Sequence, residues 1–151
     1  MLPLLTRIDH VGIACRDLRR AIDMYRETFG IGVVSLEENV EQGVREAMLA
    51  VEAATPGLDV PGGRPGYIQL LEPLSPDTPV GKFIARRGEG LHHVGYGVAD
   101  ISEALATIGG TGLRLIDERP RHGSMGASIA FLHPGDLGGV LTELVQFVSP
   151  A

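Results

Sequence analysis

Four polar side chains, each set among apolar neighbours, are the residues of this sequence best suited to chemistry: His10, Gln69, His93 and Glu143. Two imidazoles, one amide oxygen and one carboxylate form a mixed nitrogen and oxygen ligand set. Such a set suits divalent Mn, Fe, Co, Ni or Zn. Any one of these residues alone is more simply explained as a structural histidine or a solvent-facing strand residue, so the metal hypothesis depends on how the four are arranged.

The arrangement comes from an internal repeat. Residues 8–22 read IDHVGIACRDLRRAI and residues 91–105 read LHHVGYGVADISEAL, which aligns His10 with His93 at a separation of 83 residues. The later segments YIQLL (67–71) and LTELV (141–145) align Gln69 with Glu143. The four candidates are therefore two equivalent pairs, and one shared metal would satisfy polar groups that are costly to bury singly.

His92 is the alternative to His93 as a ligand. Adjacent residues of a strand point to opposite faces, so only one of the two is expected to face a metal. The repeat selects His93, because His92 aligns with Asp9.

Each repeat predicts a strand, a helix and three further strands. Apolar residues recur at helical spacing after each opening strand. Asp17 and Asp100 are suited to cap these helices, which are expected to end at Gly30 and Gly109. The later strands are predicted at 31–36, 44–51, 67–71, 113–118, 127–132 and 140–147, with a loop at 55–65.

The predicted fold class is α+β, with two βαβββ repeats forming a curved mixed sheet around a metal cavity. We expect residues 1–151 to form a single domain, with repeat halves at about 6–75 and 90–148. A linking helix is predicted at about 76–89, where Thr78-Pro79 is typical of a helix start.

Composition excludes several classes of partner. The formal net charge is −6 and no Lys/Arg run exceeds two residues, which argues against nucleic acid and anionic membranes. No apolar stretch approaches the roughly 18 residues of a membrane span. Cys15 is the only cysteine, so no internal disulfide can form, and a cytoplasmic location with a packed, inert thiol is expected.

Five segments resemble the methylmalonyl-CoA epimerases of the vicinal oxygen chelate, or glyoxalase, superfamily. They are IDHVGIACRDLRRAIDMYRETFG (8–30), EQGVRE (41–46), IQLLEPL (68–74), GEGLHHVGYGVADI (88–101) and IAFLHPGDLGGVLTELVQ (129–146). The GLHH and FLHP pieces are the more specific. The resemblance implies a homodimer that binds an acyl-CoA, with cobalt, or else Mn, Ni, Fe or Zn, held by His10, Gln69, His93 and Glu143.

The implied reaction interconverts (R)- and (S)-methylmalonyl-CoA by removal and return of the C2 proton through a metal-stabilised enolate. Glu46, in the EQGVRE piece and on a predicted strand, is the expected base. Glu143 is the second catalytic candidate and would double as ligand and base. The rival interpretations are a glyoxalase I-like isomerase, an extradiol dioxygenase and a metal-free, antibiotic-sequestering protein. Only the metal-free protein would lack the whole ligand set.

Overall fold

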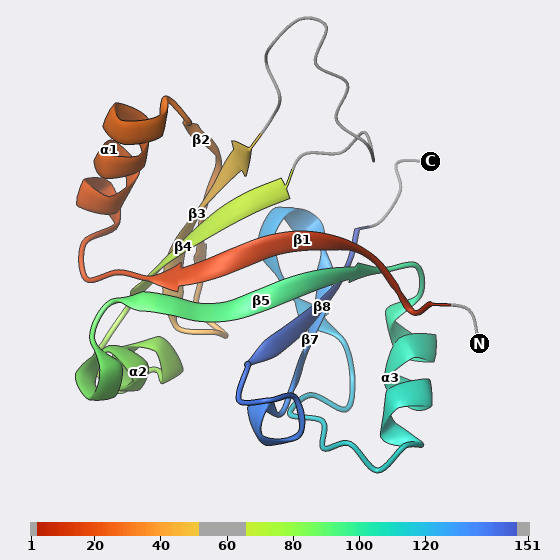
Figure 1. The fold of residues 1–151 in the computed structure, drawn as a ribbon. Helices are drawn as coiled ribbons and strands as arrows, with labels where there is room; N and C mark the ends of the chain where they lie inside the picture. Colours follow the sequence, from red (N-terminus) through yellow and green to blue (C-terminus); the bar gives the residue numbers. More distant parts are fainter. Residues whose placement is uncertain (1–2, 52–65, 148–151) are drawn as a thin grey trace, which may run out of the picture. The chain divides into compact units, whose positions relative to one another are not determined.

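The computed structural model of the protein describes residues 3–51 and 66–147 (Figure 1). It divides into two compact units, one of Met1–His10 and His92–Ala151 (unit 1) and one of Val11–Leu91 (unit 2). Two strands run through both units: β1 (Leu5–Ala14) and β5 (Gly90–Val98). The predicted loop at 55–65 lies outside the described residues.

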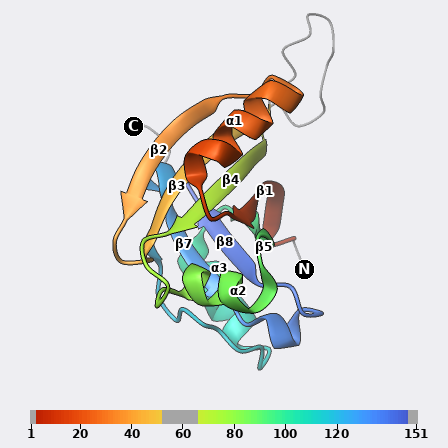
Figure 2. The ribbon, with the colours of Figure 1, turned by 90° about the vertical axis from the view of Figure 1, so that its left-hand side faces the viewer.

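Unit 2 follows the first repeat. After β1 its elements are α1 (Leu18–Phe29), β2 (Val33–Asn39), β3 (Val44–Val51), β4 (Gly66–Pro73) and α2 (Pro79–Arg87). Strand β3 pairs antiparallel with both β2 and β4. Helix α1 packs on one face of β3 and β4 (Figure 2), over a core that includes Leu18, Leu49 and Leu70. Because strand residues alternate, Glu46 and Gln69 lie on the face away from α1.

Unit 1 follows the second repeat. After β5 its elements are α3 (Ile101–Gly109), β6 (Arg121–His122), β7 (Ser128–Leu132) and β8 (Thr142–Gln146), with short 3-10 helices at Ser124–Gly126 and Pro134–Asp136. Strand β5 pairs parallel with β8, whereas β7 pairs antiparallel with β8 and β6. Helix α3 packs on β7 and β8 over Leu105, Leu132 and Leu144. Both units have the predicted βαβββ order, and unit 1 combines parallel with antiparallel pairing, so the α+β class is confirmed.

The helix starts are as predicted. The carboxylates of Asp17 and Asp100 accept hydrogen bonds from the N–H of Arg20 and Glu103, at 3.0 and 2.9 Å. Thr78 caps α2 and Pro79 stands in its first turn. Gly30 ends α1 with φ of 72°. Helix α3 instead includes Gly109 and ends at Gly110, one residue later than predicted.

The strand predicted at 113–118 is wrong. Leu115 makes one isolated bridge with Leu132. The N–H groups of Ile116 and Asp117 then both donate to the carbonyl of Phe131, while the Asp117 carboxylate accepts the Phe131 N–H at 2.9 Å. A side chain thus replaces the next backbone acceptor and ends the pairing. The strand in this place is β6, which begins later.

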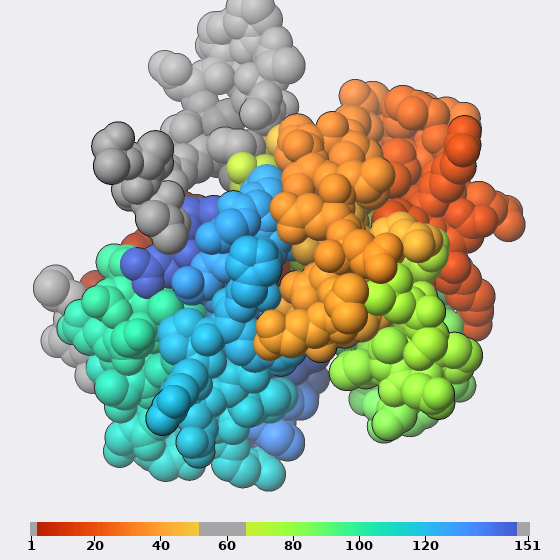
Figure 3. Space-filling view, turned by 180° about the vertical axis from the view of Figure 1, so that it is seen from behind, coloured from red at the N-terminus to blue at the C-terminus, as the bar shows by residue number. Residues whose placement is uncertain are grey.

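The edge strand of unit 2, β2, lies on the face that Figure 3 draws, where it is orange. Its Val34 and Leu36 are largely exposed. Cys15 is buried in the α1 core, and burial raises the pKa of its thiol to about 12, in keeping with an inert cysteine. No helix among the described residues is long and apolar enough to cross a membrane. The expected single domain, with halves at 6–75 and 90–148, stays a prediction.

Replacing Asp100 with alanine should lower the free energy of unfolding by about 1 kcal/mol, because the Glu103 N–H loses its acceptor at the start of α3. Asp17→Ala should have a similar effect at α1. Equilibrium denaturation measures both. Glu27→Ala, on an exposed site of α1, is the control and should stay within about 0.5 kcal/mol of the wild type. A cap variant as stable as this control would contradict the capping role.

Candidate metal centre

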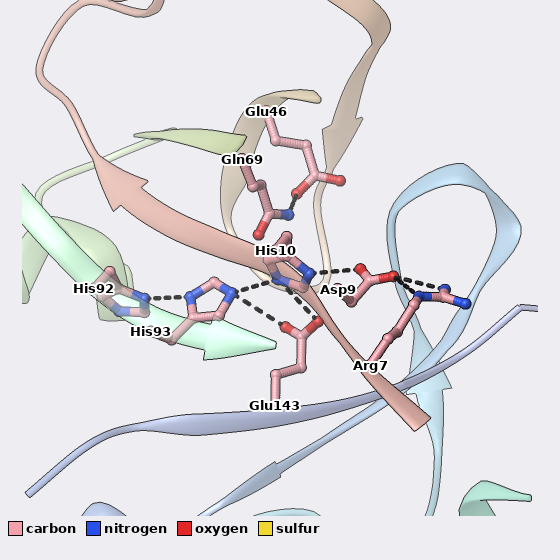
Figure 4. A network of polar contacts seen from close by, with 8 residues as sticks. All are labelled: Arg7, Asp9, His10, Glu46, Gln69, His92, His93 and Glu143. Atoms are coloured by element: carbon pink, nitrogen blue, oxygen red, sulfur yellow. Dashed lines mark hydrogen bonds and ion pairs between the residues drawn. The ribbon is translucent and has the colours of Figure 1, made fainter. Parts of the chain in front are cut away.

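Unit 1 brings three of the predicted ligands together (Figure 4). The Nε2 atoms of His10 and His93 lie 2.9 Å apart. The Oε1 atom of Glu143 lies 3.4 Å from His10 Nε2, and its Oε2 atom lies 3.5 Å from His93 Nε2. One potential ligand atom from each residue falls within 4.8 Å of the others. These side chains come from β1, β5 and β8, so the cluster needs strands from both ends of the chain.

Strand register explains why the cluster forms. In the parallel pairing of β5 with β8, Gly95 is opposite Glu143 and therefore shares its face of the sheet. His93, two residues before Gly95, points the same way. The neighbouring residue of β8, Leu144, points to the other face, into the core beneath α3. Alternation thus separates the polar face from the apolar one.

A glycine leaves room for the His10 ring. A Cβ built on Gly95 would overlap the Cε1, Nδ1 and Nε2 atoms of His10. Gly95 has an ordinary negative φ, so the requirement here is space rather than backbone conformation. On another side His93 meets the ring of Phe131 edge-on, with ring centroids 5.4 Å apart.

The three residues fit a divalent cation. His10, His93 and Glu143 are only 4%, 2% and 4% exposed. Burial, and then the nearby His10 and His92 rings, lower the pKa of His93 well below its usual value, so its ring favours the neutral form that binds metals. Two imidazoles and a carboxylate that converge in a buried place match a catalytic Zn, Co or similar site.

Each histidine also has a partner on its outer side. The Nδ1 of His10 lies 2.8 Å from a carboxylate oxygen of Asp9, which is itself bonded to Arg7. The Nδ1 of His93 lies 2.9 Å from the Nδ1 of His92. Burial lowers the pKa of His92 to about 4. For Asp9, burial opposes ionisation, but hydrogen bonds from His10 and Arg7 outweigh it and lower the pKa.

The two remaining predicted site residues lie together in unit 2. Gln69 Nε2 donates a hydrogen bond of 2.8 Å to the Glu46 carboxylate, and both side chains are buried. Glu46 is opposite Leu71 in the pairing of β3 with β4, so Gln69 is its diagonal neighbour. This hydrogen bond uses the amide nitrogen of Gln69 and therefore directs the amide oxygen away from Glu46. The amide oxygen is the atom that binds metals.

Asp9 and His92 are functional candidates that the sequence interpretation missed. His92 was set aside because only one residue of an adjacent pair in a strand can face the metal, and Asp9 was not singled out. The signal was nevertheless in the repeat, because it aligns Asp9 with His92 as it aligns His10 with His93. Two polar residues in equivalent positions beside two ligands indicate a shared role.

Comparison with known families places the fold. The model of the glyoxalase/bleomycin resistance protein/dioxygenase superfamily matches residues 9–131. This match and the two βαβββ units show a protein of the vicinal oxygen chelate class.

Closer relatives narrow the class. The chain is 50% identical to a methylmalonyl-CoA epimerase solved in complex with methylmalonyl-CoA and NH4+, with a TM-score of 0.88 over 96% of each chain. A variant of the Streptomyces coelicolor methylmalonyl-CoA epimerase, in complex with 2-nitronate-propionyl-CoA, is 49% identical with a TM-score of 0.88, covering 96% of this chain and 99% of that one. The ethylmalonyl-CoA/methylmalonyl-CoA epimerase of Cereibacter sphaeroides is 32% identical over 145 residues, which are 95% of this chain and 99% of the relative. The chain belongs to the methylmalonyl-CoA epimerase family.

Gly95→Ala should weaken metal binding by about tenfold or more, since the added methyl group displaces a ring that the site requires. Calorimetric titration of the metal-free protein with zinc measures the affinity. Gly32→Ala is the matched control, because a Cβ there meets nothing within 4 Å. Both variants should keep the unfolding cooperativity of the wild type. Wild-type zinc affinity in Gly95→Ala would show that the His10 ring does not need this space.

Proposed function

We propose that the protein is a metal-dependent epimerase that interconverts (R)- and (S)-methylmalonyl-CoA by moving the proton at C2. The carrying observation is the buried cluster of His10, His93 and Glu143, in a chain half identical to an epimerase solved with methylmalonyl-CoA. The same cluster makes a metal-free binding protein a poor alternative, because such a protein has no use for converging buried ligands.

Gln69 is the proposed fourth ligand. It is supported by its place in the repeat, equivalent to that of Glu143, and by the hydrogen bond that orients its amide. The proposed ion is cobalt, with Mn, Ni, Fe or Zn also compatible with these donors. A bound divalent ion would act as a Lewis acid and stabilise the negative charge that develops when the C2 proton leaves.

Glu46 is the proposed base. Glu46 is 2% exposed, and its carboxylate accepts the Gln69 N–H, which fixes the orientation of the group that would take the proton from carbon. Inversion also requires proton delivery to the opposite face of the planar intermediate. Glu143 is the proposed second acid/base, since one of its carboxylate oxygens could bind the metal while the other accepts a proton.

The proposed setting is a cytoplasmic homodimer that acts on acyl-CoA. The single cysteine, which allows no internal disulfide, supports a reducing compartment. The net charge of −6 supports a small-molecule partner rather than nucleic acid or a membrane surface. The homodimer rests on the family resemblance.

Metal-replete protein should exchange the C2 hydrogen of methylmalonyl-CoA for deuterium from D2O and convert one epimer into a mixture of both. Proton NMR follows the exchange. Removal of the metal with a chelator should abolish it, and added cobalt should restore it, because the C2 carbanion is then stabilised again. No exchange by metal-replete protein, with turnover of the methylglyoxal–glutathione adduct instead, would contradict the proposal in favour of a glyoxalase.

Glu46→Gln should lower the exchange rate by about 10²- to 10⁴-fold, because an amide cannot accept the C2 proton. Cobalt affinity, measured by calorimetry, should remain close to that of the wild type. Glu27→Gln makes the same chemical change on an exposed site of α1 and should leave both quantities unchanged. A near-normal rate in Glu46→Gln would remove Glu46 from the mechanism.

A further inference from the structure

The outer contact of His10 restricts where its ring carries a proton. Asp9 is 1% exposed, and its Oδ2 lies 2.8 Å from His10 Nδ1. Its other oxygen, Oδ1, receives two hydrogen bonds from the Arg7 guanidinium, at 2.7 and 3.1 Å. An ionised carboxylate can only accept, so the facing Nδ1 of His10 must donate. A neutral ring with its proton on Nδ1 presents the lone pair of Nε2 to the cluster.

The outer contact of His93 poses the same question with a different partner. Its Nδ1 lies 2.9 Å from the Nδ1 of His92, and one of these two nitrogens must carry the bridging proton. The Nε2 of His93 faces His10 and Glu143. When Nε2 supplies the lone pair for a metal, the proton of neutral His93 is on Nδ1. His92 must then accept through Nδ1 and carry its own proton on Nε2.

We infer that Asp9 and His92 are positioning residues that fix the tautomers of the two metal-binding histidines. The inference rests on the metal site of the proposed function. In each repeat the residue immediately before the ligand holds the outer nitrogen of the ligand's ring, so the device is duplicated together with the ligand. Outer partners of this kind commonly set the orientation and basicity of a metal-bound imidazole.

The duplicated device is chemically unequal in the two halves. His10 is held by a buried carboxylate that a guanidinium secures, whereas His93 is held by a neutral ring. A carboxylate partner increases the electron density of the imidazole more than a neutral acceptor does. His10 is therefore the stronger electron-pair donor to the metal. Removing the charge of Asp9 should cost more metal affinity than removing the hydrogen-bond acceptor at His92.

The direct test measures the ring protons in the whole protein. Protein labelled with ¹⁵N in its histidines is loaded with zinc, which is diamagnetic, and long-range ¹H–¹⁵N spectra identify the protonated nitrogen of each ring. Single substitutions of the five histidines assign the signals. We expect the proton on Nδ1 of His10 and His93 and on Nε2 of His92.

The possible results separate the two proposals. Zinc binding with the proton of His92 on Nδ1, or with either ligand bound through Nδ1, overturns this inference and leaves the metal site intact. Wild-type protein that binds no zinc overturns both. Zinc binding with the three expected tautomers supports the inference whatever the substrate proves to be.

Variants provide a second readout. Asp9→Asn keeps an acceptor oxygen without the charge and should weaken zinc binding by about 10- to 100-fold. His92→Leu removes the acceptor and should weaken binding by about tenfold, whereas His92→Asn keeps an acceptor near Nδ1 and should restore most of it. His122→Leu, at an exposed histidine, is the matched control and should bind zinc as the wild type does.

A purely structural role predicts a different pattern. It would lower the unfolding midpoint of the metal-free variants and give no rescue by His92→Asn. Equal zinc affinity in His92→Leu and His92→Asn, or an unchanged affinity in Asp9→Asn, overturns the assignment of these residues as positioning groups.

Discussion

Three electron-rich side chains held together away from water impose the main constraint on unit 1. The Nε2 atoms of His10 and His93 are 2.9 Å apart, and the Glu143 carboxylate is within 3.5 Å of both. Such a cluster is costly to bury unless a cation or shared protons neutralise it. The surrounding strands must therefore resist its separation. The parallel pairing of β5 with β8, and the core that α3 covers, supply that rigidity.

Periodicity and end signals made most of the fold predictable from sequence. The repeat located both βαβββ units, and short-range capping by Asp17 and Asp100 located the helix starts. The prediction of a strand at 113–118 failed because Leu113 and Leu115 alternate as in a strand and pack against α3, but form no ladder of backbone hydrogen bonds. A long-range bond from the Asp117 carboxylate to the Phe131 N–H ends the pairing there, and no local pattern encodes that contact.

The sequence predicted the metal-binding residues of the candidate site better than it predicted the residues that hold them in place. The symmetric placement of His10 with His93 and of Gln69 with Glu143 indicated a metal from the sequence alone. Four polar residues in equivalent positions among apolar neighbours need a common explanation. Strand alternation, however, predicts the face from which a side chain starts, but not whether the side chain bends back to contact a neighbouring residue. Asp9 and His92 bend back to the outer nitrogens of their neighbours, a contact that strand alternation does not predict.

The division of the chain into units has a consequence for biosynthesis. Unit 2 is continuous in sequence, from Val11 to Leu91, and all of its residues are available once that stretch has left the ribosome. Unit 1 instead joins Met1–His10 to a segment that starts at His92. The first ligand to be translated, His10, must await Glu143, so the cluster closes only after the segment that carries His93 and Glu143 has also been made. Late, non-local closure of this kind is slow, and an ion would be captured at the end of folding rather than used to nucleate it.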